Sequence, residues 1–181
     1  MNPATNDDAD CLLAAASSGH ADDVRVLTRM SAGANDNAQR NDGVSALHVA
    51  SRTGRTDIVK LLLENGADIE TRDINGCTPL WIAAANGHGE VIETLIASGA
   101  DADAISYNRY LPFHAAIENG YTDAAVTLLE LDNSTKLADI YYCSLLRFMT
   151  EVFKGSEKQI LSLVRRLRKS GTEGCLAKCG H

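Results

Sequence analysis

Five histidines and five cysteines are the side chains of this sequence that are best suited to acid–base or metal chemistry. Imidazole titrates near neutral pH, and both residue types bind zinc. Catalysis needs further groups, yet the sequence contains no Gly-x-Ser-x-Gly, no His-Glu-x-x-His and no phosphate-binding glycine-rich motif. The carboxylates fall mostly at turns and on polar helix faces, which brings no pair into a shared cleft. The sequence therefore predicts a protein that is not an enzyme.

The cluster with the clearest metal-ligand character is the C-terminal Cys175-x-x-x-Cys179-x-His181. Its three potential zinc ligands have an unusual spacing and no obvious fourth partner. We therefore interpret residues 172–181 as a flexible tail and predict no metal and no cofactor. The cysteines are odd in number and show no disulfide framework, which predicts a reducing, intracellular location in the cytoplasm or nucleus.

A sequence pattern recurs every 33 residues. Gly54, Gly87 and Gly120 lie 33 residues apart, and so do Gly66 and Gly99. Three variants of one phrase accompany them: Gly-Val-Ser-Ala-Leu-His at 43–48, Gly-Cys-Thr-Pro-Leu-Trp at 76–81 and Arg-Tyr-Leu-Pro-Phe-His at 109–114. A period of this length predicts supersecondary units that stack on one another.

The phrase resembles the ankyrin repeat, whose pattern is a turn glycine, Thr-Pro-Leu-His, two alanines, Gly-His, an apolar helix and Gly-Ala-Asp. The resemblance implies an all-α solenoid of helix–turn–helix units with β-turn fingers. It also accounts for four histidines, which fill the Thr-Pro-Leu-His and Gly-His positions (His48, His114, His20 and His88). The expected segments are a disordered start at 1–7, four repeats at 8–39, 40–72, 73–105 and 106–132, a degenerate fifth repeat or cap at 133–171, and the tail.

The copies differ in quality. Residues 73–101 match best, with Thr78 as a helix N-cap, Pro79 at the first helical position and Cys77 at the tip of a finger. The fourth copy has Arg109 in place of the turn glycine and Leu111 in place of the N-cap, so its first helix should start less sharply. The first copy carries two extra residues between its glycines, at positions that the sequence leaves open.

The region beyond residue 132 is helical by its apolar spacing but no longer follows the phrase. Two helices joined by a short link suit a repeat that closes the stack. The basic stretch 165–169 complements the dipole of the second helix, and a nuclear import or anionic-membrane signal is the alternative interpretation.

Charge is divided unevenly along the chain. Residues 1–132 hold eight Lys or Arg against twenty Asp or Glu, a net charge of −12, and residues 133–181 hold nine against four, a net charge of +5. An acidic repeat array does not suit nucleic acid and favours a basic protein or peptide partner, although solubility alone is an equal explanation. No signal peptide or membrane span is evident, and we expect a soluble monomer.

The resemblance implies that partners bind a concave groove lined by the fingers and the first helix of each repeat. The positions that vary there are the residues flanking the turn glycine and the last residues of the first helix. Carried onto this sequence, with Trp81 at the base of the groove, the expected binding residues are Asn41, Asp42, Val44, Arg52, Ile74, Asn75, Cys77, Trp81, Tyr107, Asn108, Tyr110 and Glu118.

Within that set we expect a hot-spot patch, because Trp, Tyr and Arg dominate binding energy at interfaces. Its members are Arg52, Trp81, Tyr107, Tyr110 and Glu118. Packing is the competing interpretation: Trp81 could fill a gap left by a missing histidine, and Tyr110 could cover the neighbouring finger. Tyr107 is harder to explain by packing.

Three functions remain open at the level of sequence. The first is a non-catalytic adaptor, scaffold or inhibitor that binds a protein or peptide. The second is a reader of a cationic or methylated lysine, with Trp81, the tyrosines and Glu118 as an aromatic, acidic cage. The third is a structural module of a larger assembly that makes its contact through the basic C-terminal cap.

Overall fold

The computed structural model describes residues 6–30, 37 and 39–131 of this 181-residue chain. This part contains eight helices and no strand longer than an isolated bridge. The helices come in four consecutive pairs: α1 (Asn6–Ser18) with α2 (Ala21–Met30), α3 (Ala46–Thr53) with α4 (Thr56–Glu64), α5 (Pro79–Ala85) with α6 (Gly89–Ala97), and α7 (Pro112–Glu118) with α8 (Thr122–Leu131). The predicted all-α solenoid is confirmed.

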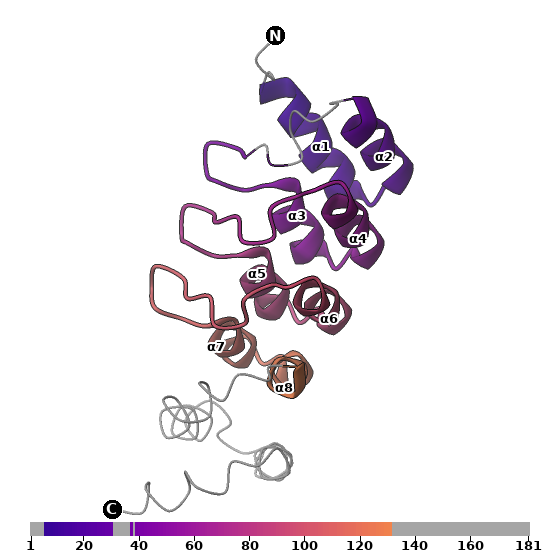
Figure 1. Cartoon of the computed structure of the whole chain (residues 1–181). Helices are drawn as coiled ribbons and strands as arrows, with labels where there is room; N and C mark the ends of the chain where they lie inside the picture. Colours follow the sequence, from indigo (N-terminus) through magenta and orange to yellow (C-terminus); the bar gives the residue numbers. More distant parts are fainter. Residues whose placement is uncertain (1–5, 31–36, 38, 132–181) are drawn as a thin grey trace, which may run out of the picture.

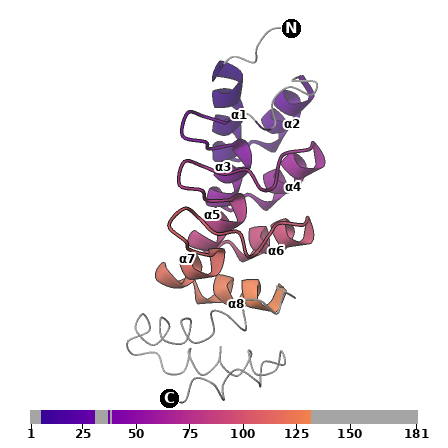
Figure 2. The same cartoon turned by 60° about the vertical axis from the view of Figure 1, so that its left-hand side comes forward.

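The pairs stack in two layers (Figure 1). One layer contains α1, α3, α5 and α7, and the other contains α2, α4, α6 and α8, with each helix packed on the next in its own layer. Figure 2 shows loops projecting from the first layer to one side. We call them finger 1 (residues 39–45), finger 2 (72–78) and finger 3 (105–111).

Local sequence sets where the inner helices begin. Ser45 and Thr78 are extended N-caps whose hydroxyls accept bonds from the backbone N–H of residues 48 and 81, at 3.4 and 3.3 Å. Leu111 has no side-chain acceptor, yet α7 begins at the equivalent residue. Its backbone N–H donates to Nδ1 of His114 at 3.2 Å, so a histidine ring takes over one of the capping bonds.

Small residues allow the layers to approach closely. Ala46, Ala50, Ala83, Ala84 and Ala116 are fully buried where neighbouring inner helices meet. The outer helices fill the space behind them with larger residues, which are also fully buried: Ile58, Val59, Leu62, Val91, Ile92 and Leu95. Burial of this apolar face, more than helix propensity, stabilises helices of only seven to ten residues.

The turn between two helices of a pair is covered by the next pair. Gly54 has φ +72°, and a Cβ atom built on it would lie 2.7 Å from Nδ1 of His88. The other ring nitrogen, Nε2, lies 2.9 Å from the carbonyl oxygen of Arg52. Glycine is therefore required there both by backbone conformation and by close packing of the histidine.

The N-terminal boundary was predicted two residues too late. We expected disorder through residue 7, but α1 begins at Asn6. A short acidic sequence is compatible with a helix start as well as with a tail, because negative charge is favourable near a helix N-terminus. The predictions for residues 133–181, including the cap, the basic stretch and the Cys175, Cys179 and His181 cluster, lie outside the described residues.

Candidate interaction surface

Each finger is a tight turn closed by its own backbone. In finger 2, Gly76 N–H donates to the carbonyl of Asp73 at 2.8 Å, and Asp73 N–H donates to the carbonyl of Cys77 at 3.1 Å. The buried Asp73 carboxylate accepts from the N–H groups of Asn75 and Cys77, at 2.9 and 2.8 Å. These bonds hold the tip in one conformation, because few polar backbone groups of the turn remain unpaired.

The fingers are also bonded to one another. Ile74 N–H donates to the carbonyl of Asp42 at 2.8 Å, and one finger along Tyr107 N–H donates to the carbonyl of Asn75 at 2.9 Å. Arg72 adds a side-chain bridge, because its Nη1 donates to the carbonyls of Gly76 and Ile105 at 3.1 and 2.7 Å. The three fingers therefore present a continuous, preformed edge (Figures 1 and 2).

A histidine joins the first two fingers at their base. Nδ1 of His48 accepts from Ser45 N–H at 3.2 Å, so Nε2 carries the proton and donates to the carbonyl of Cys77 at 3.0 Å. Burial lowers the pKa of His48, although the Cys77 carbonyl, Asp73 and Asp42 oppose the shift. Burial lowers the pKa of His114 in the same way, against the charge of Glu118. In each ring Nδ1 accepts a bond from a backbone N–H, so both histidines act as neutral, structural groups.

Trp81 occupies the position that His48 and His114 hold in their repeats. Its ring is half-buried, and its Nε1 is buried without a hydrogen-bond partner in the described part of the chain. Indole donates only, so it cannot accept the capping bond that a histidine ring accepts. The geometry favours the view that Trp81 fills the space between repeats and stays partly accessible.

The fingertips carry the most exposed apolar side chains. Ile74 is 68% exposed and Tyr107 is 69% exposed, and they hold equivalent positions on fingers 2 and 3. Tyr107 nevertheless packs, because a Cβ atom built on Gly76 would lie 2.6 Å from its Cδ1. The competing packing interpretation had Tyr110 covering the neighbouring finger and found Tyr107 harder to explain. Among the described residues, the Tyr107 ring covers finger 2. The Tyr110 ring meets the His114 ring edge-on, with 6.0 Å between the ring centroids.

Cys77 does not lie at the surface as we predicted. Its side chain is only 5% exposed, and burial raises the pKa of its thiol to about 12, with the Asp73 carboxylate adding to the rise. The residue follows the turn glycine, and the next residue, Thr78, is buried as well. This position belongs to the packing of the finger rather than to its outer surface.

The other expected binding residues lie on the fingers and at the ends of the inner helices. Asn41, Asn75, Asn108, Arg52 and Glu118 are exposed, and Asp42 and Val44 are half-buried. Asp42 forms an ion pair with Arg40 at 3.3 Å. The fingers and the ends of the inner helices thus bring eleven of the twelve residues to accessible positions, whereas the Cys77 side chain is withdrawn.

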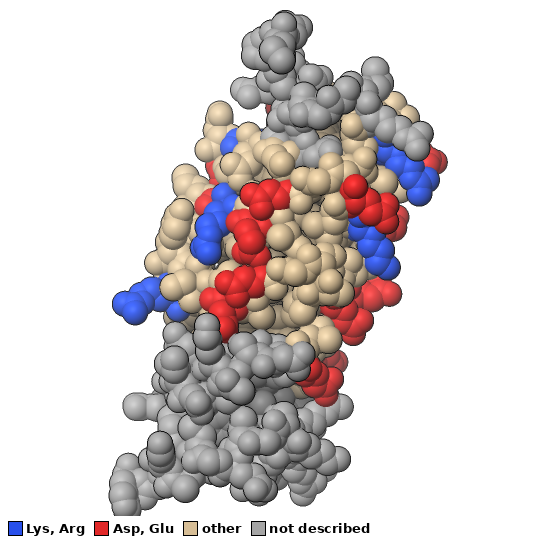
Figure 3. All heavy atoms as spheres, in the orientation of Figure 1, with Lys and Arg blue, Asp and Glu red and all other residues tan. Residues whose placement is uncertain are grey.

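Charged side chains of both signs lie on the face that Figure 3 shows. Figure 3 shows Lys and Arg along the finger edge and a band of Asp and Glu beside it. A chain of hydrogen bonds links four carboxylate residues in the loops after α4 and α6, which are Asp68, Glu70, Asp101 and Asp103. Burial raises the pKa of Glu70, and the charges of Asp101 and Asp68 add to the shift, whereas the Asp101 N–H bond and Arg72 oppose it.

Comparison of the repeats placed Arg109 at the turn position but did not include it among the expected binding residues. Its φ is +65°, whereas the equivalent Gly43 and Gly76 have φ of +75° and +73°. A left-handed conformation costs a residue with a Cβ roughly 1–2 kcal/mol. The signal was visible in the sequence as the missing turn glycine, but we interpreted it only as degeneration of the copy.

Two further observations concern only the described residues. No three His, Cys, Asp or Glu side chains in this part gather as they would around a metal ion. None of its helices combines the length and the apolar character needed to cross a membrane.

Comparison with known proteins agrees with this geometry. Residues 47–96, from α3 through most of α6, match the family model described as ankyrin repeats (many copies). A search of curated proteins finds no match to this sequence. The matched segment contains two helix pairs and finger 2 between them, and the same unit recurs on both sides of it. Residues 47–96 are therefore identified as ankyrin repeats, and the helix pairs on both sides of them have the same arrangement.

Proposed function

We propose that this protein is a non-catalytic interaction module whose finger edge and inner helices bind a protein or peptide partner. Ankyrin repeats as a class suggest protein–protein interaction, and they are typically non-catalytic. The observation that carries the proposal is the hydrogen-bonded row of fingers, because Ile74 and Tyr107 donate backbone bonds to the finger before them. A surface fixed before binding loses little conformational entropy when a partner docks.

We keep the five residues of the hot-spot patch in the proposal, with Arg52, Tyr110 and Glu118 as its main contacts. Arg52 and Glu118 are exposed at the ends of α3 and α7, and Tyr110 remains 38% exposed. Trp81 contributes at most one ring face, because its Nε1 is buried. A partner that spans the ends of the inner helices would contact Arg52, Tyr110 and Glu118 together.

The methyl-lysine reader has weaker support. An aromatic cage requires several ring faces turned toward one cation. In the described part of the chain, the Tyr107 ring covers Gly76 and the Tyr110 ring contacts His114 edge-on. Among the described residues no ring contact joins Trp81 to either tyrosine, so this geometry does not supply three walls of a cage.

The remaining expectations about partners stay proposals. A basic partner would suit the carboxylate band of Asp68, Glu70, Asp101 and Asp103, and nucleic acid would not. Contact through the basic C-terminal segment, as in the structural-module interpretation, falls on residues outside the described part. A monomeric, intracellular protein with no cofactor remains our working assumption.

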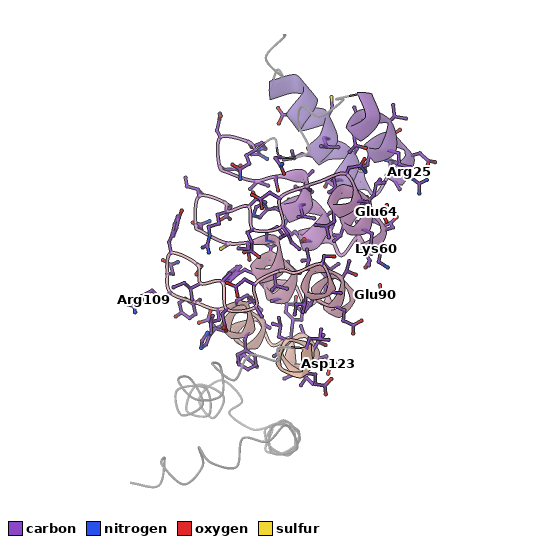
Figure 4. The ribbon with its side chains drawn as sticks, in the orientation of Figure 1. Arg25, Lys60, Glu64, Glu90, Arg109 and Asp123 are labelled. Carbon is purple, nitrogen blue, oxygen red and sulfur yellow. The ribbon has the colours of Figure 1, made fainter. Side chains whose placement is uncertain are left out.

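The test is an affinity pull-down with a groove variant, Arg52→Ala with Tyr110→Ala and Glu118→Ala. The matched control is Arg25→Ala with Lys60→Ala and Glu64→Ala, on the outer helices far from the fingers (Figure 4). We expect the wild type and the control to retain a partner that the groove variant loses, with equal helical circular dichroism in all three. Equal retention by the groove variant would refute the proposal and direct attention to the C-terminal segment.

A further inference from the structure

Finger 3 differs from the other two at its turn. Arg109 adopts φ +65° where the equivalent positions are glycine. Glycine would take this conformation without strain, so arginine makes the turn less stable than it could be. Backbone strain of this kind persists where a side chain serves a function, and an observed outlier is a reason to ask which one.

The Arg109 side chain has no structural task that would explain its presence. Its guanidinium makes no hydrogen bond or ion pair within the described residues, and only its backbone N–H is used, donating to the Ser106 carbonyl at 2.8 Å. Figure 4 shows the side chain pointing away from the molecule, on the side opposite Arg25 and Lys60. This contrasts with Arg72, which bridges two fingers, and Arg40, which is paired with Asp42.

The surroundings of Arg109 combine positive charge with apolar surface. Tyr107 and Tyr110, on either side in the chain, are 69% and 38% exposed, and Ile74 is exposed on finger 2. Between Ser106 and Leu111 there is no carboxylate, and the carboxylate of finger 2, Asp73, is buried and accepts bonds from backbone N–H groups. An unpaired guanidinium beside exposed aromatic rings is a recognition element for a carboxylate next to an apolar side chain.

We propose that the tip of finger 3 recognises an acidic segment of the partner, in which an Asp or Glu pairs with Arg109 and a neighbouring apolar side chain packs on Tyr107 and Ile74. This inference rests on the proposed function and names the partner chemistry for one end of the same surface. It departs from the expectation based on net charge, which favoured a basic partner.

The strained turn provides an unusual diagnostic. Arg109→Gly removes the guanidinium and the strain together, so it should weaken binding while the chain unfolds at a higher temperature than the wild type. A purely structural role for Arg109 would move both quantities in the same direction. Arg109→Lys keeps the charge but loses the planar fork, and it should bind with intermediate affinity.

The experiment uses the full chain and a displayed library of random dodecapeptides at physiological salt. We expect the enriched peptides to be acidic with an aromatic or large aliphatic residue beside the carboxylate. Arg109→Gly should bind them about tenfold more weakly, the loss that follows from removing one charge-assisted hydrogen bond. Lys60→Gln removes the same unit of charge from the outer face and should bind as the wild type does.

Three results would overturn the inference: an enrichment of basic or uncharged peptides, binding that is unaffected by Arg109→Gly, or a lower unfolding temperature for that variant. These failures are separable from failure of the proposed function. If peptides or a lysate partner are lost with the Arg52, Tyr110 and Glu118 groove variant but kept by Arg109→Gly, the interaction module stands and only the role of Arg109 falls.

Discussion

The contact between Tyr107 and Gly76 decides how much of the most exposed tyrosine is available for binding, and Gly76→Ala tests it. The glycine has φ +73°, and an added Cβ atom would meet the Tyr107 ring at 2.6–2.8 Å. The substitution therefore has two costs, one from the backbone conformation and one from displacing the ring. Gly66→Ala isolates the first cost, because Gly66 has φ +91° and no atom lies within 4 Å of the new Cβ.

The two costs can be estimated separately. A left-handed alanine costs roughly 1–2 kcal/mol, and the lower entropy of the unfolded chain returns about 0.4–1 kcal/mol, which leaves about 1 kcal/mol for Gly66→Ala. Tyr107 is 69% exposed, so about 30% of a tyrosine surface of roughly 200 Å² is covered, which is worth about 1.5 kcal/mol at ~25 cal/mol per Å². Gly76→Ala should then cost about 2.5 kcal/mol.

The assay is urea unfolding followed by circular dichroism, applied to a double-mutant cycle. In a Tyr107→Ala background the ring is gone, so Gly76→Ala should cost no more than Gly66→Ala, about 1 kcal/mol. Equal costs for Gly76→Ala and Gly66→Ala in the wild-type background would refute the reasoning. The Tyr107 ring would then be free of finger 2, and its whole surface would be available to a partner.

The remaining predictions concern a histidine, the tryptophan and a cysteine. Burial lowers the pKa of His48 in the folded state, so below pH ~6.5 the folded chain binds fewer protons than the unfolded chain. The contribution of His48 to the free energy of unfolding is therefore complete above that pH. Below it, the free energy of unfolding falls by up to about 1.4 kcal/mol per pH unit. Unfolding free energies measured across this window should fall less steeply in His48→Gln, and an unchanged slope would show that His48 is not the titrating group. Trp81→Phe removes a buried unpaired donor and should change the unfolding free energy by no more than about 1 kcal/mol. Trp81→Ala should instead cost about 3 kcal/mol, because it leaves a cavity. A similar loss for both variants would mean that Nε1 has a partner. Since Cys77 is buried and its pKa is raised to about 12, iodoacetamide should modify the exposed Cys11 in the folded chain and Cys77 only after unfolding. Mass spectrometry measures the two rates of modification, and equal rates would contradict the burial of Cys77.

Several features could be predicted from local sequence because each depends on a few neighbouring residues. The N-caps at Ser45 and Thr78, Pro79 at the first turn and the period of the glycines specify where helices start and how the units repeat. A strong repeat period also implies that equivalent residues occupy equivalent places, as Ile74 and Tyr107 do on neighbouring fingers. The weak points were the ends, where the start of α1 departs from the expected boundary.

Other features depended on how the fingers close and pack on one another, and for these the tertiary structure was decisive. The repeat pattern put Cys77 at a fingertip, but its side chain turns inward under the Asp73 carboxylate, because the finger closes around its own turn. The pattern also left Tyr107 unexplained, since nothing local indicates that its ring covers Gly76 of the preceding finger. Net charge summed over residues 1–132 described the repeats as acidic, although the fingers also carry arginines, of which Arg72 bridges two fingers and Arg109 points away from the molecule. By itself the sequence determined the repeated unit, because caps, turns and apolar spacing act within one repeat. Which side chains remain free for a partner was decided only when one repeat packed on the next.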